Sequence, residues 1–117
     1  MGPIDIVIGG KPLKVHELTL GESFVVARMQ KAAIAAPVED FDYQVMRVQF
    51  YPVMFCCTKG VDCTVPNEKE FFELTAKDAS LWYETAYSIN PDAFPKPVNE
   101  AVPSSEEVAE SEKEKKG

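Results

Sequence analysis

The chain has 117 residues, 45% of them hydrophobic, which is enough for one folded domain with its own core. Its formal net charge is −7, so we expect neither nucleic acid nor an anionic membrane surface as a partner. No apolar run approaches the roughly 20 residues of a spanning helix. The first ten residues lack the positive start of a signal peptide, and the three cysteines are expected to be reduced thiols in a cytosol.

Alternating apolar residues predict a β-hairpin in the first 18 residues. Residues 4–8 place three isoleucines on one face, and Gly9-Gly10 forms a turn pair that tolerates positive φ. Residues 11–15 continue the alternation. Pro12 has no amide donor, so we expect the second strand to have a free edge at that point.

The next two predicted elements are helices. Thr19 with Glu22 three residues later is typical of a capping box, and it predicts a helix over about residues 20–35 that Pro37 ends. The dense apolar pattern of residues 41–57 predicts a second helix, kinked or broken at Pro52. Its uncharged second half, residues 53–57, is expected to be the most buried part of the domain.

After a predicted turn at Lys59-Gly60, residues 61–65 alternate as in a short third strand. This strand is expected to pair with the hairpin. Asn67 is a candidate cap for a short helix that reaches about residue 74, and Thr75 begins a last helix that runs to about residue 88. Asn90-Pro91 ends it.

These elements predict an α+β fold, with the hairpin and the short third strand packed on three to four helices. Residues 1–95 form the predicted interaction domain. Residues 96–117 contain six acidic and four basic side chains and no aromatic one. Such a segment buries too little apolar surface to offset its ordering entropy, so we expect a disordered charged tail.

The residues that could carry chemistry fit no catalytic or metal site. His16 is the only histidine, and we expect it to be an exposed strand residue without a nucleophile beside it. The spacing of Cys56, Cys57 and Cys63 does not suit zinc, so buried thiols are the expected state of the first two. Gly9-Gly10-Lys11 precedes a strand and therefore differs from a phosphate-binding loop. We expect no enzyme, no cofactor and no metal.

Aromatic residues on the last two predicted helices are the candidates for partner binding. Aromatic residues at helical spacing usually belong to a core, whereas Trp and Tyr are also favoured at interfaces where a partner helix docks. Both interpretations stay open, and two adjacent phenylalanines cannot both face the same core. The candidates are Phe71, Phe72, Trp82, Tyr83 and Tyr87.

Several segments, in this order, resemble the tail assembly chaperones of long-tailed bacteriophages. The resemblance covers about residues 4–95 and rests on short hairpin, capping and helix-closing patterns. It implies a non-catalytic chaperone of the bacterial host cytoplasm that binds the tape-measure protein, promotes tail-tube assembly, contacts the tail-tube protein and can self-associate. The matching segments are Gly9-Gly10-Lys11, Glu17-Leu18-Thr19, Gly21-Glu22, Val61-Asp62, Leu74-Thr75-Ala76 with Asp78, and Ile89-Asn90-Pro91.

The resemblance also implies a longer form made by ribosomal frameshifting. Lys115-Lys116 near the end of the chain is compatible with an A-rich slippery codon run, which the nucleotide sequence can test. Three alternatives remain. The first is a small structural subunit of a phage particle for tail or head completion. The second is a small enzyme that uses Cys57 or Cys63, and the third is an unrelated adaptor.

Overall fold

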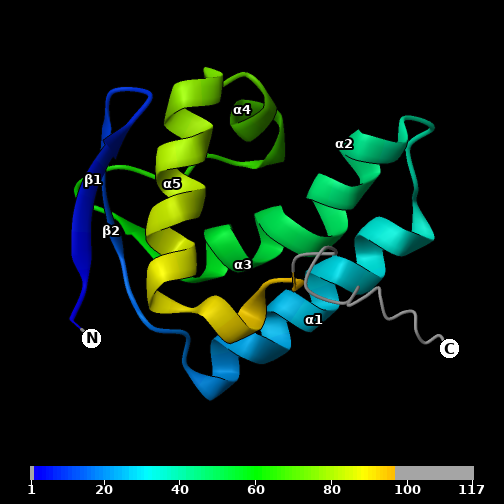
Figure 1. Ribbon diagram of the computed structural model, residues 1–117, viewed down its shortest axis with the longest axis horizontal. Helices are drawn as coiled ribbons and strands as arrows, with labels where there is room; N and C mark the ends of the chain where they lie inside the picture. Colours follow the sequence, from blue (N-terminus) through cyan, green and yellow to red (C-terminus); the bar gives the residue numbers. More distant parts are fainter. Residues whose placement is uncertain (1, 97–117) are drawn as a thin grey trace, which may run out of the picture.

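The computed structural model describes residues 2–96, and segment 97–117, which holds nearly all of the predicted charged tail, lies outside the described residues. A three-stranded antiparallel sheet packs against helices, which confirms the α+β class. In Figure 1 the sheet lies on the left, and the helices extend from it to the right. Within residues 2–96, no helix combines the length and the apolar character needed to cross a membrane.

The predicted hairpin is confirmed. Strand β1 (Ile4–Ile8) pairs with β2 (Lys11–Val15), and the turn between them uses Gly9 and Gly10 at φ 57° and 79°, where glycine carries no steric penalty. The register puts Ile6 opposite Leu13, so the apolar residues of both strands share one face. Three side chains on this face have exposed fractions of 1% or less: Ile8, Leu13 and Val15.

One expectation about the sheet is wrong. Strand β3 is Thr58–Gly60 and not residues 61–65. A Cβ atom on Gly60 would collide with the Cys63 carbonyl, and Asp62 has φ 58°, so the chain turns sharply directly after Gly60. In addition, β2 is the central strand, with the order β1-β2-β3. Strand β3 pairs only with residues 13–15, so Pro12 has no registered partner on the β3 side, which agrees with the free edge expected at that point.

Helix α1 (Leu20–Ala35) has the predicted bounds and the predicted capping box. The Glu22 N–H donates to the Thr19 Oγ1 at 3.1 Å, and the Thr19 N–H donates to a Glu22 carboxylate oxygen at 3.0 Å. The helix buries Val26 and Ala33 on the side that packs against the following helical segments. Its start therefore comes from local capping and its position from one apolar face.

The helix predicted over residues 41–57 is confirmed, and its irregularity is a π-helical segment. Helix α2 (Phe41–Val45) continues through the π-helical segment η1 (Met46–Phe50) into α3 (Tyr51–Cys56). The Tyr51 N–H donates to the Met46 carbonyl five residues earlier. Widening the turn directly before Pro52 lets the helix pass a residue that would otherwise clash with a carbonyl one turn back.

Residues 53–57 are deeply buried, as expected. All but the half-buried Phe55 have exposed fractions of 8% or less. Helix α4 (Glu68–Phe72) begins at an Asn67 capping box, and α5 (Ala76–Ile89) begins at Thr75. A short 3-10 turn (Pro91–Ala93) follows. Helix α5 stands between the sheet and α3, so the main core forms on both of its sides (Figure 1).

Candidate partner-binding groove

The five aromatic candidates separate into buried and accessible residues. Phe71 and Trp82 have exposed fractions of 3% and 0%, and both pack against the Tyr51 ring in the core. The core interpretation is therefore right for these two residues, which cannot touch a partner on the folded surface. Phe72 is half-buried and stacks on Tyr43 with ring centroids 3.8 Å apart, so it joins α4 to α2.

Tyr83 and Tyr87 lie one turn apart on α5 and reach the surface together. Their ring centroids are 5.8 Å apart, and Tyr87 is 38% exposed. Phe50 of η1 contacts Tyr83 edge-on at 5.5 Å, and the buried Phe94 contacts both tyrosines at 5.2 and 6.0 Å. Four rings, from η1, from α5 and from the segment directly after α5, thus form one cluster with an open side.

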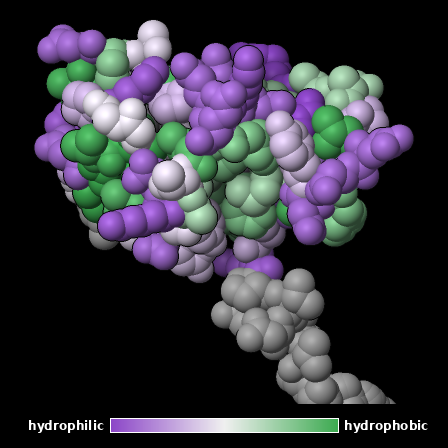
Figure 2. All heavy atoms as spheres, turned by 90° about the horizontal axis from the view of Figure 1, so that it is seen from above, coloured by the Kyte–Doolittle hydropathy of each residue, from purple (hydrophilic) through white to green (hydrophobic). Residues whose placement is uncertain are grey.

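The open side of this cluster is a groove between η1 and α5, which we call the aromatic groove. It consists of a hollow of about 440 Å³ and an adjoining hollow of about 200 Å³, which share Phe50 and Tyr83. In Figure 2 apolar side chains gather in the middle of one face, beside the point where the described chain ends. The lining residues are Val45, Met46, Gln49, Phe50, Ala79, Ser80, Tyr83, Tyr87, Pro95 and Lys96.

The chemistry of this lining suits binding better than catalysis. It contains no histidine, cysteine or carboxylate. Burial raises the pKa of Tyr83, and the neighbouring Tyr87 adds to the rise, so the phenol stays neutral and can donate a hydrogen bond. Tyrosines that combine an apolar ring with a polar tip are common anchors at protein interfaces.

A second hollow of about 480 Å³ lies on the outer face of the sheet, but it offers less to a partner. Its floor is shallow β-sheet surface that carries Val7 and Pro12, and Lys14 donates to Asp5 there at 2.7 Å. It has no aromatic side chain. Because aromatic anchors dominate binding energy at interfaces, we take the aromatic groove as the candidate site.

The thiols are poorly suited to nucleophilic chemistry. Cys56 and Cys57 are buried, as expected, and burial raises the pKa of each thiol to about 11. The Cys57 thiol lies 3.5 Å from the Met54 carbonyl, to which it donates. Cys63 is half-buried, with its sulfur 3.4 Å from the Pro12 carbonyl oxygen. Within residues 2–96, no three His, Cys, Asp or Glu residues are grouped as a metal site requires.

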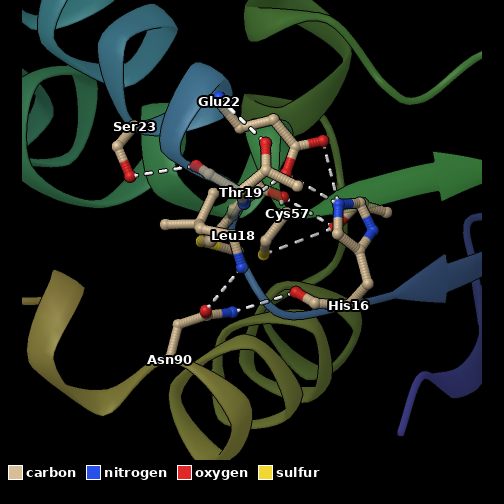
Figure 3. Close-up of polar contacts among 9 residues, drawn as sticks. His16, Leu18, Thr19, Glu22, Ser23, Cys57 and Asn90 are labelled. Atoms are coloured by element: carbon tan, nitrogen blue, oxygen red, sulfur yellow. Dashed lines mark hydrogen bonds and ion pairs between the residues drawn. The ribbon is translucent and has the colours of Figure 1, made fainter.

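The expectation that His16 is an exposed strand residue is wrong. His16 follows β2, its side chain is 18% exposed, and its Nε2 lies 3.0 Å from both carboxylate oxygens of Glu22 (Figure 3). Its backbone N–H donates to the Cys57 carbonyl at 2.7 Å. The capping box fixes Glu22 in place, and this brings the carboxylate to the ring. Among the described residues, no thiol or hydroxyl hydrogen-bonds to that ring, so His16 orders the entry to α1.

Glu22 gives this contact a defined dependence on pH. Burial opposes ionisation of Glu22, but hydrogen bonds from Thr19 and His16 and the charge of His16 outweigh it and lower the pKa below the ordinary value of 4.5. A carboxyl group with a depressed pKa stabilises the fold above that ordinary value, and the contribution disappears as pH falls through the folded-state pKa.

Glu22→Gln should therefore lower the free energy of unfolding by about 1 kcal/mol at pH 6, because glutamine keeps the cap but loses the charged contact. Urea denaturation at pH 6 and pH 3 measures this difference. The difference between the two proteins is expected to shrink as pH falls through the lowered folded-state pKa of Glu22. An equal difference at both pH values would contradict the role of the Glu22 charge.

Asn90 completes this region by joining the end of α5 to the entry of α1. Its Oδ1 accepts from the Leu18 N–H at 2.9 Å, and its Nδ2 donates to the His16 carbonyl at 3.1 Å (Figure 3). Both ends of the side-chain amide therefore bond to backbone partners more than 70 positions away in sequence. This contact network is structural, and it fixes the end of α5 that carries Tyr87 and leads to Phe94.

Sequence reasoning identified Tyr83 and Tyr87 but missed Phe50 and Phe94. Phe50 belongs to an apolar run that predicts burial, and only the π-helical segment turns it toward the groove.

Comparison with protein-family models, curated proteins and solved structures finds no match to this chain. The function is therefore argued from the groove itself.

Proposed function

We propose that this protein is a non-catalytic tail assembly chaperone of a long-tailed bacteriophage, acting in the bacterial host cytoplasm. It binds helical segments of the tape-measure protein and so promotes assembly of the tail tube around them. The aromatic groove is the observation that carries the proposal, because it combines the half-buried Tyr83 and the exposed Tyr87 with a lining that has no catalytic group. The resemblance of residues 4–95 to such chaperones supports the same function.

The groove has the physical properties that an amphipathic helix requires. Apolar helix faces bind in apolar grooves through side chains spaced three or four residues apart. Here Val45 and Phe50 form one wall and Tyr83 and Tyr87 form the other, so the groove runs between two helical segments. The tyrosine rings supply apolar area, and their hydroxyl groups remain able to bond with polar groups on the partner.

The chain's charge supports a role in keeping an apolar protein soluble. A net charge of −7 opposes association between chaperone molecules. A tape-measure protein that is long and helical exposes apolar stripes before assembly, and covering them with an acidic partner prevents aggregation. The proposal needs only binding and release, and no reaction.

Replacing Tyr83 and Tyr87 together by serine should weaken the complex with the tape-measure protein by about tenfold or more, because two aromatic anchors are lost. The partner for the measurement is a candidate tape-measure protein, co-expressed with the full chain and followed by co-purification and calorimetry. Val7→Ser is the matched control, since Val7 is 60% exposed on β1 away from the groove.

Circular dichroism and the melting temperature of each variant separate binding from folding. A double variant that is folded and binds as tightly as the natural chain would contradict the assignment of the groove. Absence of any complex with the natural chain, together with detection of the protein in purified virions, would instead favour a structural subunit and reject the chaperone function.

A further inference from the structure

The outward face of α1 carries a second apolar stripe. Leu20, Phe24 and Ile34 are 73%, 57% and 61% exposed, although large apolar side chains usually face a core. Together with Ala27 and Lys31 they follow the spacing 4-3-4-3 along the helix. This spacing places all five on one side of α1 and matches the seam of a two-helix coiled coil.

The other side of α1 accounts for its packing within the domain. Val26 and Ala33 are buried against η1 and α3, so the outward stripe is additional to the apolar face that the fold uses. In Figure 1 α1 lies along one edge of the molecule, with the segment α2–α3 on one side of it. Within residues 2–96, the outward stripe is left uncovered.

The unpaired charges of α1 itself are positive, although the protein as a whole is acidic. Arg28 and Lys31 are both exposed on α1, and neither makes an ion pair with a described residue. Glu22 is the only acidic residue of the helix, and His16 occupies its carboxylate. A lysine within an apolar seam is costly unless the opposing helix places a carboxylate near it.

We propose that the outward face of α1 binds an acidic amphipathic helix of another protein. The partner's apolar residues pack on Leu20, Phe24 and Ile34, and its carboxylates face Arg28 and Lys31. This surface is separate from the aromatic groove and does not depend on the function proposed above. It gives the protein two helix-binding surfaces of different composition, one lined mainly by aromatic rings without carboxylates, the other an exposed apolar stripe flanked by Arg28 and containing Lys31.

A second copy of this chain fits the same face poorly. A parallel pairing of two α1 helices would put Lys31 opposite the second copy's Lys31. An antiparallel pairing centred on Ala27 would place both Arg28 side chains on the same flank of the pair. Because α1 has no free carboxylate to compensate, either arrangement brings like charges together.

Two synthetic peptides of about 21 residues, or three heptads, test the proposal. Both have the same leucine seam; one has glutamate at every flanking position and the other lysine. Fluorescence anisotropy with the full chain should show the glutamate peptide bound about tenfold more tightly or better. The double variant Arg28→Glu with Lys31→Glu should reverse this preference. Equal binding of the two peptides, or an unchanged preference in the variant, would overturn the proposal.

Phe24→Ser tests the apolar part of the same surface and should weaken binding of the glutamate peptide by about tenfold. Val7→Ser is the exposed control. The double variant Tyr83→Ser with Tyr87→Ser should leave the affinity for the glutamate peptide unchanged, which separates the two surfaces.

Two results would show that something other than a partner helix covers the outward face of α1, and either would reject the proposal. One is a dimer in analytical ultracentrifugation that Phe24→Ser dissociates. The other is peptide affinity that rises only when the six glutamates of residues 97–117 become glutamine.

Discussion

Replacing Trp82 with alanine is expected to lower the free energy of unfolding by about 3–5 kcal/mol. The side chain is fully buried, and its ring contacts Tyr51 and Phe71 at centroid distances of 6.5 and 5.9 Å. Its Nε1–H donates at 3.0 Å to the Thr58 hydroxyl, which in turn donates to the Met54 carbonyl at 2.6 Å. Removal of the indole leaves a large cavity where helix α5, helix α3 and the sheet meet.

Urea denaturation followed by circular dichroism measures this loss, since Trp82 is the only tryptophan and its fluorescence disappears with it. Trp82→Phe should cost less, about 1–2 kcal/mol, because it keeps an aromatic ring but loses the bond to Thr58. Leu81→Ala, at a 42% exposed position on the same helix, controls for helix propensity and should stay within about 1 kcal/mol. A Trp82→Ala loss no larger than that of Leu81→Ala would refute the central role of the indole.

Replacing Asn90 with alanine should cost about 2–3 kcal/mol of unfolding free energy, more than an exposed cap usually contributes. Asn90 is 8% exposed, and its amide satisfies the Leu18 N–H and the His16 carbonyl together. The variant leaves both backbone groups without their partner in a partly buried site. An unpaired buried polar group costs more than a hydrogen bond contributes.

Hydrogen exchange at the Leu18 amide distinguishes this mechanism from a general loss of packing. Exchange at that amide should accelerate far more than exchange in the hairpin. Ser88→Ala is the matched control, because Ser88 only donates to the Thr85 carbonyl at the exposed end of the same helix. If Asn90→Ala and Ser88→Ala had the same stability, the two backbone contacts would carry no net energy.

Local signals predicted most of the helices correctly. The capping pattern at Thr19 and Glu22 gave the first residue of α1, because a cap acts within one turn and depends on few neighbours. Asn67 and Thr75 predicted α4 and α5 in the same way. The hairpin was equally predictable from the sequence. Strict alternation around a double glycine allows only one strand register that buries all the apolar side chains on a single face.

Features that depend on distant contacts were not predictable from the pattern. The alternation of residues 61–65 resembles a strand, but steric contact between Gly60 and Cys63 turns the chain first. His16 looks like an exposed strand position until Glu22 is fixed beside it. The bonds of Asn90 to residues 16 and 18 join opposite ends of the domain and leave no local signal in the sequence.

For the candidate site, the sequence indicated two helices, α4 and α5, of which only α5 lines the groove, and it did not indicate the accessible side of α5. Trp82 and Tyr83 are neighbours on α5, yet the first is in the core and the second lines the groove. Helical spacing alone cannot say which side is covered, since that depends on where the sheet and α3 lie. The outward stripe of α1 was not predicted from the sequence. The helix carries apolar residues on two sides, so it lacks the single apolar face that marks an amphipathic helix.

The widened helical turn at η1 links the interior of the protein to its binding surface. A hydrogen-bonded loop of five residues in place of four rotates everything that follows it about the helix axis. Phe50 consequently faces the groove while its neighbour Tyr51 enters the core. A mutation that converted η1 into a regular α-helix would therefore not change the groove alone. The same rotation that moves Phe50 would also displace Tyr51 from the core.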